Sequence, residues 1–574
     1  MGQNDNSCLT PARPKTRSWI WLVGFIVFCV SLLSVIARAH FIQTRPFAGR
    51  LDGQESESHI LVTHLAFEQT SWKIHHFLSI FTLGAPYNKY IDQHPGAASA
   101  DRFGNYYYTS FPPLTFVLPY IAVKSVGASP SMAGLRWYNI VLQILSAFAL
   151  AGLVFLCTKK KGVEFELRLL ASATTAVIYM TAPECLKSHS INLWAEQFYA
   201  LLLIIQIICF LFYPSTLLLF VFAFIGCLAD WTSYLANLGM AGIALFSFWK
   251  TRDARALRLT IAIILGCLLA GLCIIGWYAT VIPVHDYFHN LIVRGSSREG
   301  SLSSRVTLII RYSNSFGLFS IIGLVVFFLR PWSRVNKEVV TRSEVILPGK
   351  DPFLISFLIM VIALLENLLM GDHANLYSYD RLKGVQLLAL FIVWGTTWSR
   401  GASTWIFGLS VMVGLFSICF FWRTYEMPQG WSYVAQSEQE RIGEIIVKTA
   451  STNGPAFFNG DVRGAEVYYA QRNIFQLGTN VNSVAFVQEW CRQHHFTEGT
   501  LYEISGHYPF PEEKDLPRSL RVCRVYASGK VMDIGFFQIP EKPGDYHAPS
   551  YQGHPFRNWS RLKPGDILKI LLWQ

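Results

Sequence analysis

The chain has 574 residues, of which 52% are hydrophobic and only 15% are charged. A soluble chain normally carries about 25% charged residues, so this composition excludes an ordinary soluble protein and indicates a polytopic membrane protein. The formal net charge of +11 does not predict a nucleic-acid partner, because lysines and arginines in short loops between apolar segments serve to orient a membrane protein.

The apolar segments predict an α-helical polytopic membrane protein with about eleven transmembrane helices, because a crossing needs about 20 apolar residues. The segments lie near residues 19–37, 135–157, 167–184, 196–212, 214–230, 233–249, 257–280, 315–330, 352–370, 384–398 and 404–421. The first is nearly a full span and lacks a small-residue cleavage site, so we expect no cleavable signal peptide. We expect three parts: an N-terminal tail at 1–18, a transmembrane module at 19–421 and a separate domain at 422–574.

The basic clusters predict the orientation of the chain. A cytoplasmic N-terminus places the lysines of residues 159–161 and the basic residues of 250–258 in the cytoplasm, as the positive-inside rule favours. This arrangement requires that residues 112–127, which include two adjacent prolines, do not cross the membrane. We therefore expect an interfacial or re-entrant juxtamembrane helix there, within a long external loop at 38–134.

The C-terminal region, residues 422–574, is not membrane-like, and an odd number of spans places it outside the cell membrane. Helices near 436–449, 462–470 and 481–494 are expected to alternate with strands near 456–459, 473–477 and 500–504. Such alternation predicts a small α/β extracytoplasmic domain with a largely parallel sheet. Cys491 and Cys523 lie in this domain, and the sequence alone does not decide whether they pair.

Three carboxylates follow the first span, at Asp52, Glu55 and Glu57, directly before an amphipathic helical pattern. A carboxylate held at an apolar boundary has a raised pKa, so it can accept a proton near neutral pH and act as a general base. The alternative is structural: these acids are turn and N-cap residues on a solvated face, since Ser56 and Ser58 also suit the start of a helix.

The second long external loop, residues 281–314, carries Arg294, Arg298, Arg305 and Arg311. The positive-inside rule predicts few basic residues on that side, so their presence calls for a cause. One cause is an anionic ligand, because arginine binds phosphate oxygens in a bidentate manner. Contact with anionic lipid headgroups would produce the same pattern.

A third external segment, "ENLLMGDHANLYSYDRLK" at residues 366–383, is dense in polar side chains: Glu366, Asp372, His373, Tyr379, Asp380, Arg381 and Lys383. An ionisable group in the outer part of a span is costly and is therefore a functional candidate. The alternative is an internal salt bridge between Asp380 and Lys383 or Arg381, with tyrosines that anchor the chain at the interface. The sequence has no Walker motif, no zincin pair and no GxSxG elbow, so ATP-driven pumping and soluble-type cofactor chemistry lack support.

These features resemble the GT-C superfamily of integral-membrane glycosyltransferases, near its protein mannosyltransferase and aminoarabinose transferase branch. The resemblance rests on three parts of the sequence: the acids at 52–57, the stretch "YYYTSFPPLTFVLPY" followed by "GLRWYNIVLQ", and the external "GDHANLYSYDRLK". In that family an acidic base in the first loop precedes a proline-marked juxtamembrane helix and then an arginine that opens the next span. Pro112, Pro113, Leu114 and Arg136 match in order. The resemblance covers residues 19–421, and the usual adjacent acidic pair is replaced here by spaced acids.

The resemblance implies that a sugar moves, with inversion, from a polyprenyl-phosphate donor to a lipid, glycan or protein acceptor on the outer face of the membrane. It implies an acidic base, for which Asp52 is favoured and Glu55 or Glu57 are alternates. It also implies substrate-binding residues, with phosphate contacts from Arg294, Arg298 and Lys383 and sugar contacts from His373 and Tyr379. Asp380 is included in the same substrate-binding set.

No cofactor is predicted. Relatives with pyrophosphate-linked donors need a divalent ion, whereas monophosphate-linked ones usually do not, and the spaced carboxylates favour no metal. The setting expected is a bacterial inner membrane, with membrane lipids as further partners. Two other functions stay open. One is a transporter or flippase of lipid-linked sugars, which should show internal repeats with broken helices at the midplane. The other is a membrane-anchored receptor with an α/β ligand-binding domain.

Overall fold

The structure is a computed structural model of the chain. It describes residues 16–44, 51–83, 98–101, 104–191, 193–296, 298, 300–329, 351–396, 399–426, 431–459, 464–477, 482–505 and 519–539.

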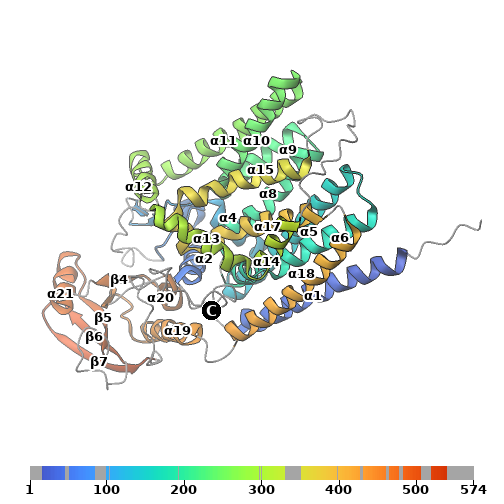
Figure 1. Ribbon diagram of the computed structural model, residues 1–574. Coiled ribbons are helices and arrows are strands. Elements are labelled where there is room, and N and C mark those ends of the chain that lie inside the picture. The colour runs from blue at the N-terminus through green and yellow to red at the C-terminus, as the bar shows by residue number, and fades with distance from the viewer. Residues whose placement is uncertain are drawn as a thin grey trace, which may run out of the picture.

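A bundle of long helices forms most of the molecule, and a smaller sheet domain lies at one end (Figure 1). The helices of the bundle are α1 (Thr16–Thr44), α5 (Met132–Lys160), α6 (Phe165–Thr181), α7 (Pro183–Ile191), α8 (Ala195–Phe212), α9 (Thr216–Ala229), α10 (Thr232–Thr251), α11 (Ala254–Ala279), α12 (Val284–Ser296), α13 (Leu302–Phe316), α14 (Phe319–Leu329), α15 (Pro352–Leu369), α16 (Gly371–Leu376), α17 (Leu382–Thr396) and α18 (Arg400–Glu426). The predicted helical membrane fold is confirmed, and helix covers most of every predicted span.

Fewer helices meet the length and hydropathy expected of a full crossing than the number of predicted segments. Among the residues that the structure describes, six helices are long and apolar enough to cross a membrane, or up to eight if each of two bent pairs is one span. The α6–α7 pair bends by 55° and the α13–α14 pair by 105°. Two other predicted segments hold the shorter helices α9 and α17, of 14 and 15 residues. The chain is an integral, multi-pass membrane protein.

Local sequence explains where several of these helices begin. Ser131 precedes α5 and its side chain accepts a hydrogen bond from the backbone N–H of Gly134. Asp351 does the same for Phe353 at the start of α15, where Pro352 occupies the first turn. Serine and aspartate satisfy backbone donors that a helix leaves open, and proline is tolerated there because its position needs no donor.

The segment between α1 and α5, which the sequence predicts to be the first external loop, forms several short elements. It contains α2 (Leu51–Gln69), α3 (Trp72–His75), the short strands β1 (Ala98–Ala100) and β2 (Tyr106–Tyr108), and α4 (Leu114–Ser125). α4 has 12 residues, too few for a crossing, as expected for the proline-marked segment. It is fixed on both sides: His64 Nε2 of α2 lies 2.8 Å from the carbonyl oxygen of Phe116, and Thr115 donates to the carbonyl of Ala229 at 2.8 Å.

The C-terminal domain is an α/β unit built on a mixed sheet. Its helices are α19 (Trp431–Thr449), α20 (Gly464–Ala470) and α21 (Ser483–Gln493), and its strands are β3 (Ala456–Asn459), β4 (Ile474–Leu477), β5 (Glu498–Ser505), β6 (Ser519–Tyr526) and β7 (Val531–Gln538). The order is β4-β3-β5-β6-β7, with β3 parallel to β4 and β5 and the remaining pairs antiparallel. The expected largely parallel sheet is thus only half parallel. Cys491 and Cys523 are both buried, free thiols.

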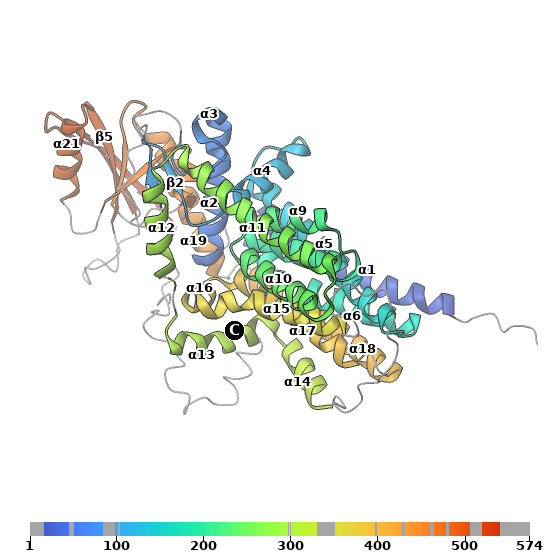
Figure 2. The same ribbon diagram turned by 90° about the horizontal axis from the view of Figure 1, so that it is seen from above.

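The C-terminal domain is packed against the first external loop. Helix α20 packs on α2, and one hydrophobic core includes Val62 and Phe67 of α2 together with Ile445 of α19 (Figures 1 and 2). The side chain of Asn473 clamps the loop: its Oδ1 accepts from the N–H of Leu83 at 2.9 Å and its Nδ2 donates to the carbonyl of Leu83 at 3.0 Å. This bidentate contact joins two segments that are 390 residues apart.

Asn473→Ala should lower the local stability of the loop around Leu83. It leaves the N–H and C=O of buried Leu83 without partners, which costs about 1–3 kcal/mol of local stability. We expect faster amide hydrogen exchange of the peptide that contains residues 78–83. Asn482→Ala is the matched control, because Asn482 caps α21 within the same domain, where its side chain accepts from the N–H of Ala485. Equal exchange of residues 78–83 in both variants would show that the Asn473 contact does not stabilise this segment.

Candidate active site

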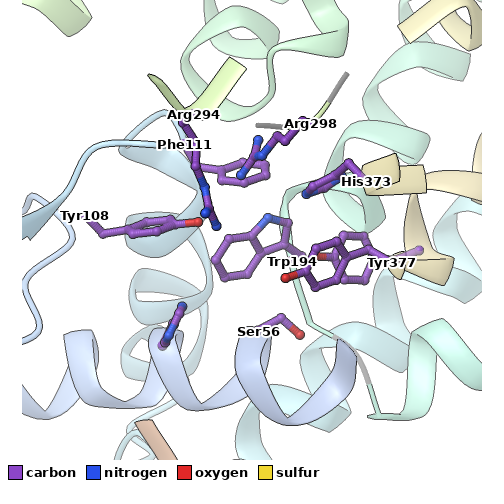
Figure 3. Close-up of a pocket in the computed structure, with 10 residues that line it drawn as sticks. Ser56, Tyr108, Phe111, Trp194, Arg294, Arg298, His373 and Tyr377 are labelled. Carbon is purple, nitrogen blue, oxygen red and sulfur yellow. The ribbon is translucent and has the colours of Figure 1, made fainter. Parts of the chain in front are cut away.

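A pocket lies where the first external loop, α12 and the segment after α15 meet (Figure 3). Its wall is formed by ten side chains: Ser56, His59, Tyr108, Phe111, Trp194, Arg294, Arg298, His373, Tyr377 and Tyr379. Four of them, the two arginines, His373 and Tyr379, belong to the predicted substrate-binding set. The fold therefore brings together residues from three segments that the sequence analysis treated separately.

Aromatic rings make up one side of the pocket. Trp194, which precedes α8, meets Phe111 edge to face with ring centroids 4.9 Å apart, and it meets Phe116 in the same manner at 5.5 Å. His59 of α2 stacks obliquely on Phe81 at 4.5 Å and lies 5.6 Å from Tyr108. Such apolar walls with a few placed polar groups are typical of small-ligand sites.

The other side of the pocket is cationic. Arg298 is 8% exposed, and its guanidinium lies 5.3 Å from the centroid of the Phe111 ring. Among the residues that the structure describes, its buried Nε has no hydrogen-bond partner, and neither has the buried Nε1 of Trp194. Arg294 of α12 points into the same space (Figure 3). Buried donors without acceptors are costly, so this pocket suits a ligand that supplies acceptor oxygens and negative charge.

His373 is oriented by Asp380. Its Nδ1 lies 2.6 Å from the Asp380 Oδ2, which leaves Nε2 for the pocket. Asp380 belongs to the short 3₁₀ helix η2 (Ser378–Arg381). Burial by itself would raise the pKa of Asp380, but the neighbouring His373 and Lys383 lower it to about 2, so the carboxylate is ionised. The carbonyl of Asp380 also accepts from Asn367 of α15, at 2.9 Å, which holds η2 on the bundle.

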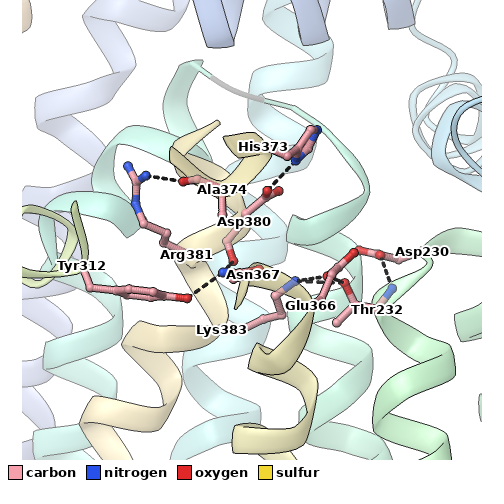
Figure 4. A network of polar contacts seen from close by, with 10 residues as sticks. All are labelled: Asp230, Thr232, Tyr312, Glu366, Asn367, His373, Ala374, Asp380, Arg381 and Lys383. Atoms are coloured by element: carbon pink, nitrogen blue, oxygen red, sulfur yellow. Dashed lines mark hydrogen bonds and ion pairs between the residues drawn. The ribbon is translucent and has the colours of Figure 1, made fainter. Parts of the chain in front are cut away.

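Lys383 lies outside the pocket, in a separate polar network (Figure 4). Its ammonium donates to the Glu366 carboxylate at 3.0 Å and to the Thr232 hydroxyl at 2.9 Å, and the side chain is only 1% exposed. The internal salt bridge weighed for Lys383 thus exists, but with Glu366 rather than Asp380. Arg381 also points away, with its Nη1 donating to the carbonyl of Ala374. The geometry gives Lys383 a structural position and no contact with the pocket.

Glu57, one of the three predicted acids, is locked in a buried ion pair. Its carboxylate accepts from Nε and Nη2 of Arg136 at 3.2 and 3.0 Å, and both side chains are fully buried. Burial raises the pKa of Glu57 to about 7, although the arginine opposes this shift. Glu57 does not line the pocket. The Arg136 side chain, which carries the family resemblance, therefore holds α2 against α5.

The side chains of Asp52 and Glu55 lie outside the described part of the structure. Their backbone belongs to the first turns of α2, and the same helix brings Ser56 and His59 to the pocket. For the described residues, no group of three or more histidine, cysteine, aspartate or glutamate side chains could hold a metal ion.

Sequence analysis missed six lining residues: Ser56, His59, Tyr108, Phe111, Trp194 and Tyr377. For Ser56 and His59 a signal existed, since they are spaced at helical intervals after Asp52. Tyr108 and Phe111 stand in the quoted aromatic stretch before the prolines. For Trp194 no signal existed, because an isolated tryptophan before an apolar span resembles an ordinary interface anchor.

Comparison with known proteins places this geometry in a known fold. No protein-family model and no curated protein matches the sequence. Among solved structures, ArnT from Cupriavidus metallidurans bound to undecaprenyl phosphate matches with a TM-score of 0.52 and 12% identity, over 85% of this chain and 94% of that chain. The chain has the GT-C fold. The archaeal oligosaccharyltransferase AglB from Archaeoglobus fulgidus, in complex with an inhibitory peptide and a dolichol-phosphate, has a TM-score of 0.48 and 10% identity, over 91% of this chain and 76% of that chain. The resemblance predicted from the sequence is thus confirmed for the GT-C fold.

Proposed function

We propose that this protein is an inverting glycosyltransferase that moves a sugar from a polyprenyl-phosphate donor to an acceptor on the external face of the membrane. The observation that carries the proposal is the convergence of Arg294 and Arg298 with His373 and an aromatic wall in one pocket of a GT-C fold. The donor chemistry is that of the ligand named for the ArnT structure, undecaprenyl phosphate.

In this proposal the first external loop supplies the base. Asp52 takes the proton of the acceptor hydroxyl as its oxygen attacks the anomeric carbon from the side opposite the phosphate. The bond between that carbon and the phosphate oxygen breaks, and the polyprenyl phosphate leaves with its electron pair. Asp52 belongs to the first turn of α2, the helix that also brings Ser56 to the pocket.

The arginines act on the leaving group. Negative charge develops on the phosphate as its bond to the sugar breaks, and guanidinium donors fixed at that position stabilise it in a low-dielectric pocket. His373, held by Asp380, and Tyr379 contact the sugar. Because two arginines supply the charge, the reaction proposed here needs no metal ion. The acceptor is a lipid, glycan or protein, and the setting is a bacterial inner membrane with the N-terminus in the cytoplasm.

The test is a transfer assay on the purified full-length protein with a radiolabelled polyprenyl-phosphate sugar and candidate acceptors. We expect transfer in the wild type, and a loss of about 10²-fold or more in Arg294→Ala and Arg298→Ala. Arg305→Ala is the matched control, because Arg305 lies on α13, is exposed and does not line the pocket. Full transfer in the two pocket variants would contradict the proposal. Facilitated movement of the lipid without any transfer would instead favour a flippase.

A further inference from the structure

Two cysteine side chains meet between α9 and α11. The thiol of Cys227 in α9 donates to the sulfur of Cys267 in α11 at 3.6 Å, and both cysteines are free. They are 40 residues apart in the chain. Neither lines the candidate active-site pocket, and the proposed sugar transfer gives neither a role. A contact between two thiols is also the arrangement from which a disulfide forms.

The two helices are close enough for a covalent link. Gly266, the residue before Cys267, lies directly against α9. A Cβ atom there would be 2.7 Å from the carbonyl oxygen of Phe220 and 2.9 Å from the Cβ of Ala223. Cys227 follows Ala223 by about one helical turn. A disulfide requires sulfurs about 2.0 Å apart on closely spaced backbones. Rotation of both cysteine side chains about their Cα–Cβ bonds supplies this approach while the helices stay in place.

The pair is buried on one side and open to lipid on the other. Cys227 is fully buried, and Asn237 of α10 donates to its sulfur at 3.8 Å. Cys267 is partly exposed. Its neighbours Ile264 and Leu268 on α11 are 43% and 59% exposed. Because α11 is long and apolar enough to cross a membrane, this exposed face contacts lipid tails. A reagent dissolved in the lipid phase therefore reaches Cys267 first.

Both helices support the same part of the pocket wall. Tyr278, near the end of α11, donates to the carbonyl oxygens of Tyr108 at 2.8 Å and Phe111 at 3.2 Å. Trp231, two residues after the end of α9, donates to the carbonyl oxygen of Ser110 at 2.8 Å. Tyr108 and Phe111 line the pocket. A covalent link between α9 and α11 would fix the two supports of this segment relative to each other.

We propose that Cys227 and Cys267 form a modification site, a dithiol that a lipid-soluble quinone oxidises to a disulfide that ties α9 to α11. The two S–H bonds break and one S–S bond forms. Both electrons and both protons pass to the quinone, which becomes the quinol. The oxidant is a quinone because the exposed sulfur faces hydrocarbon, which a water-soluble protein oxidant does not enter. Formation of this disulfide is independent of the proposed sugar transfer.

The test uses the full-length protein, reduced, placed in liposomes and incubated with or without decylubiquinone. Each sample is denatured in N-ethylmaleimide and digested, and mass spectrometry measures the alkylated and cross-linked peptides. Without the quinone, Cys227 and Cys267 should both be alkylated. With the quinone, a peptide pair joined through these two residues should replace most of the alkylated forms. Treatment with a reductant before denaturation should restore alkylation of both.

Three variants serve as controls. Cys273→Ser should leave the cross-link unchanged, because Cys273 is exposed on the same helix and is not part of the pair. Cys267→Ser should abolish the cross-link and leave Cys227 alkylated. Cys227→Ala serves the same purpose if Cys267→Ser does not fold.

Oxidation should also change stability. A cross-link restricts the unfolded chain, so oxidation should raise the unfolding temperature of the wild type by about 2 °C or more. The unfolding temperature of Cys267→Ser should not respond to the quinone. Tryptophan fluorescence during heating measures both values.

Each contrary result overturns a stated part of the proposal. If neither decylubiquinone nor the aromatic disulfide dithiodipyridine joins Cys227 to Cys267, the pair is not a modification site. Cross-linking by dithiodipyridine alone would overturn the quinone as the oxidant. A cross-link that leaves the unfolding temperature unchanged would show that it does not hold α9 to α11.

Discussion

Arg136→Ala is expected to lower the free energy of unfolding by about 3–5 kcal/mol, because it leaves the carboxyl group of Glu57 buried without its partner. Both side chains of this pair are fully buried. Thermal and denaturant unfolding of the purified protein in detergent measure the effect. The large value reflects the desolvation penalty of the Glu57 carboxyl group once it is left without a partner. It does not measure the net strength of the ion pair.

Two controls separate the penalty of an unpaired buried group from the net strength of the ion pair. Removing both charges together, in the double variant Glu57→Gln with Arg136→Met, should cost much less than Arg136→Ala alone. Arg441→Ala breaks an exposed pair with Glu444 and should cost about 1 kcal/mol or less. If Arg136→Ala is as mild as Arg441→Ala, then α2 is not held to α5 by this pair.

The apolar runs and the alternation of helical and strand patterns were enough to predict most helices and strands of the fold. The strand at Ala456–Asn459 and the helices that alternate with its neighbours follow from short-range signals. The hairpin of β6 and β7 was missed, although "SLRVCRVY" alternates and a Ser-Gly-Lys turn follows it. Both antiparallel pairs, β5–β6 and β6–β7, join strands that follow one another in the chain. Because β6 and β7 were not predicted, the half-parallel character of the sheet was not foreseen.

The ion-pair partners of the buried charged residues were less predictable from the sequence. Lys383 was predicted to bind phosphate, and the alternative was a salt bridge of Asp380 with Lys383 or Arg381. In the fold His373 contacts Asp380, and Lys383 pairs with Glu366. Both choices satisfy the rule that a buried charge needs a partner. Only the three-dimensional arrangement decides between them. The sequence signal for Arg294 and Arg298 was of another kind: basic residues in a loop predicted to be external depart from the positive-inside rule. Both arginines line the pocket, and their role in binding stays a prediction.

The burial of Glu57 narrows the choice of base to the acids before it on α2. We expect Asp52→Asn to lower sugar transfer by about 10²–10⁴-fold, the usual contribution of a general base, with unchanged affinity for undecaprenyl phosphate. The asparagine keeps the size of the side chain and removes its ability to accept a proton. In the wild type the rate should rise with pH through the pKa of the base, and this rise should vanish in the variant.

Glu55→Gln is the matched comparison, because Glu55 lies on the same helix and in the same acidic cluster. It should retain transfer if Asp52 is the base. A normal rate in Asp52→Asn with a loss in Glu55→Gln would transfer the role to Glu55, since the reaction needs only one carboxylate near the acceptor. Normal rates in both would exclude the first turns of α2 as the source of the base. The imidazole of His59, which lines the pocket on the same helix, would then be the next proton acceptor to test.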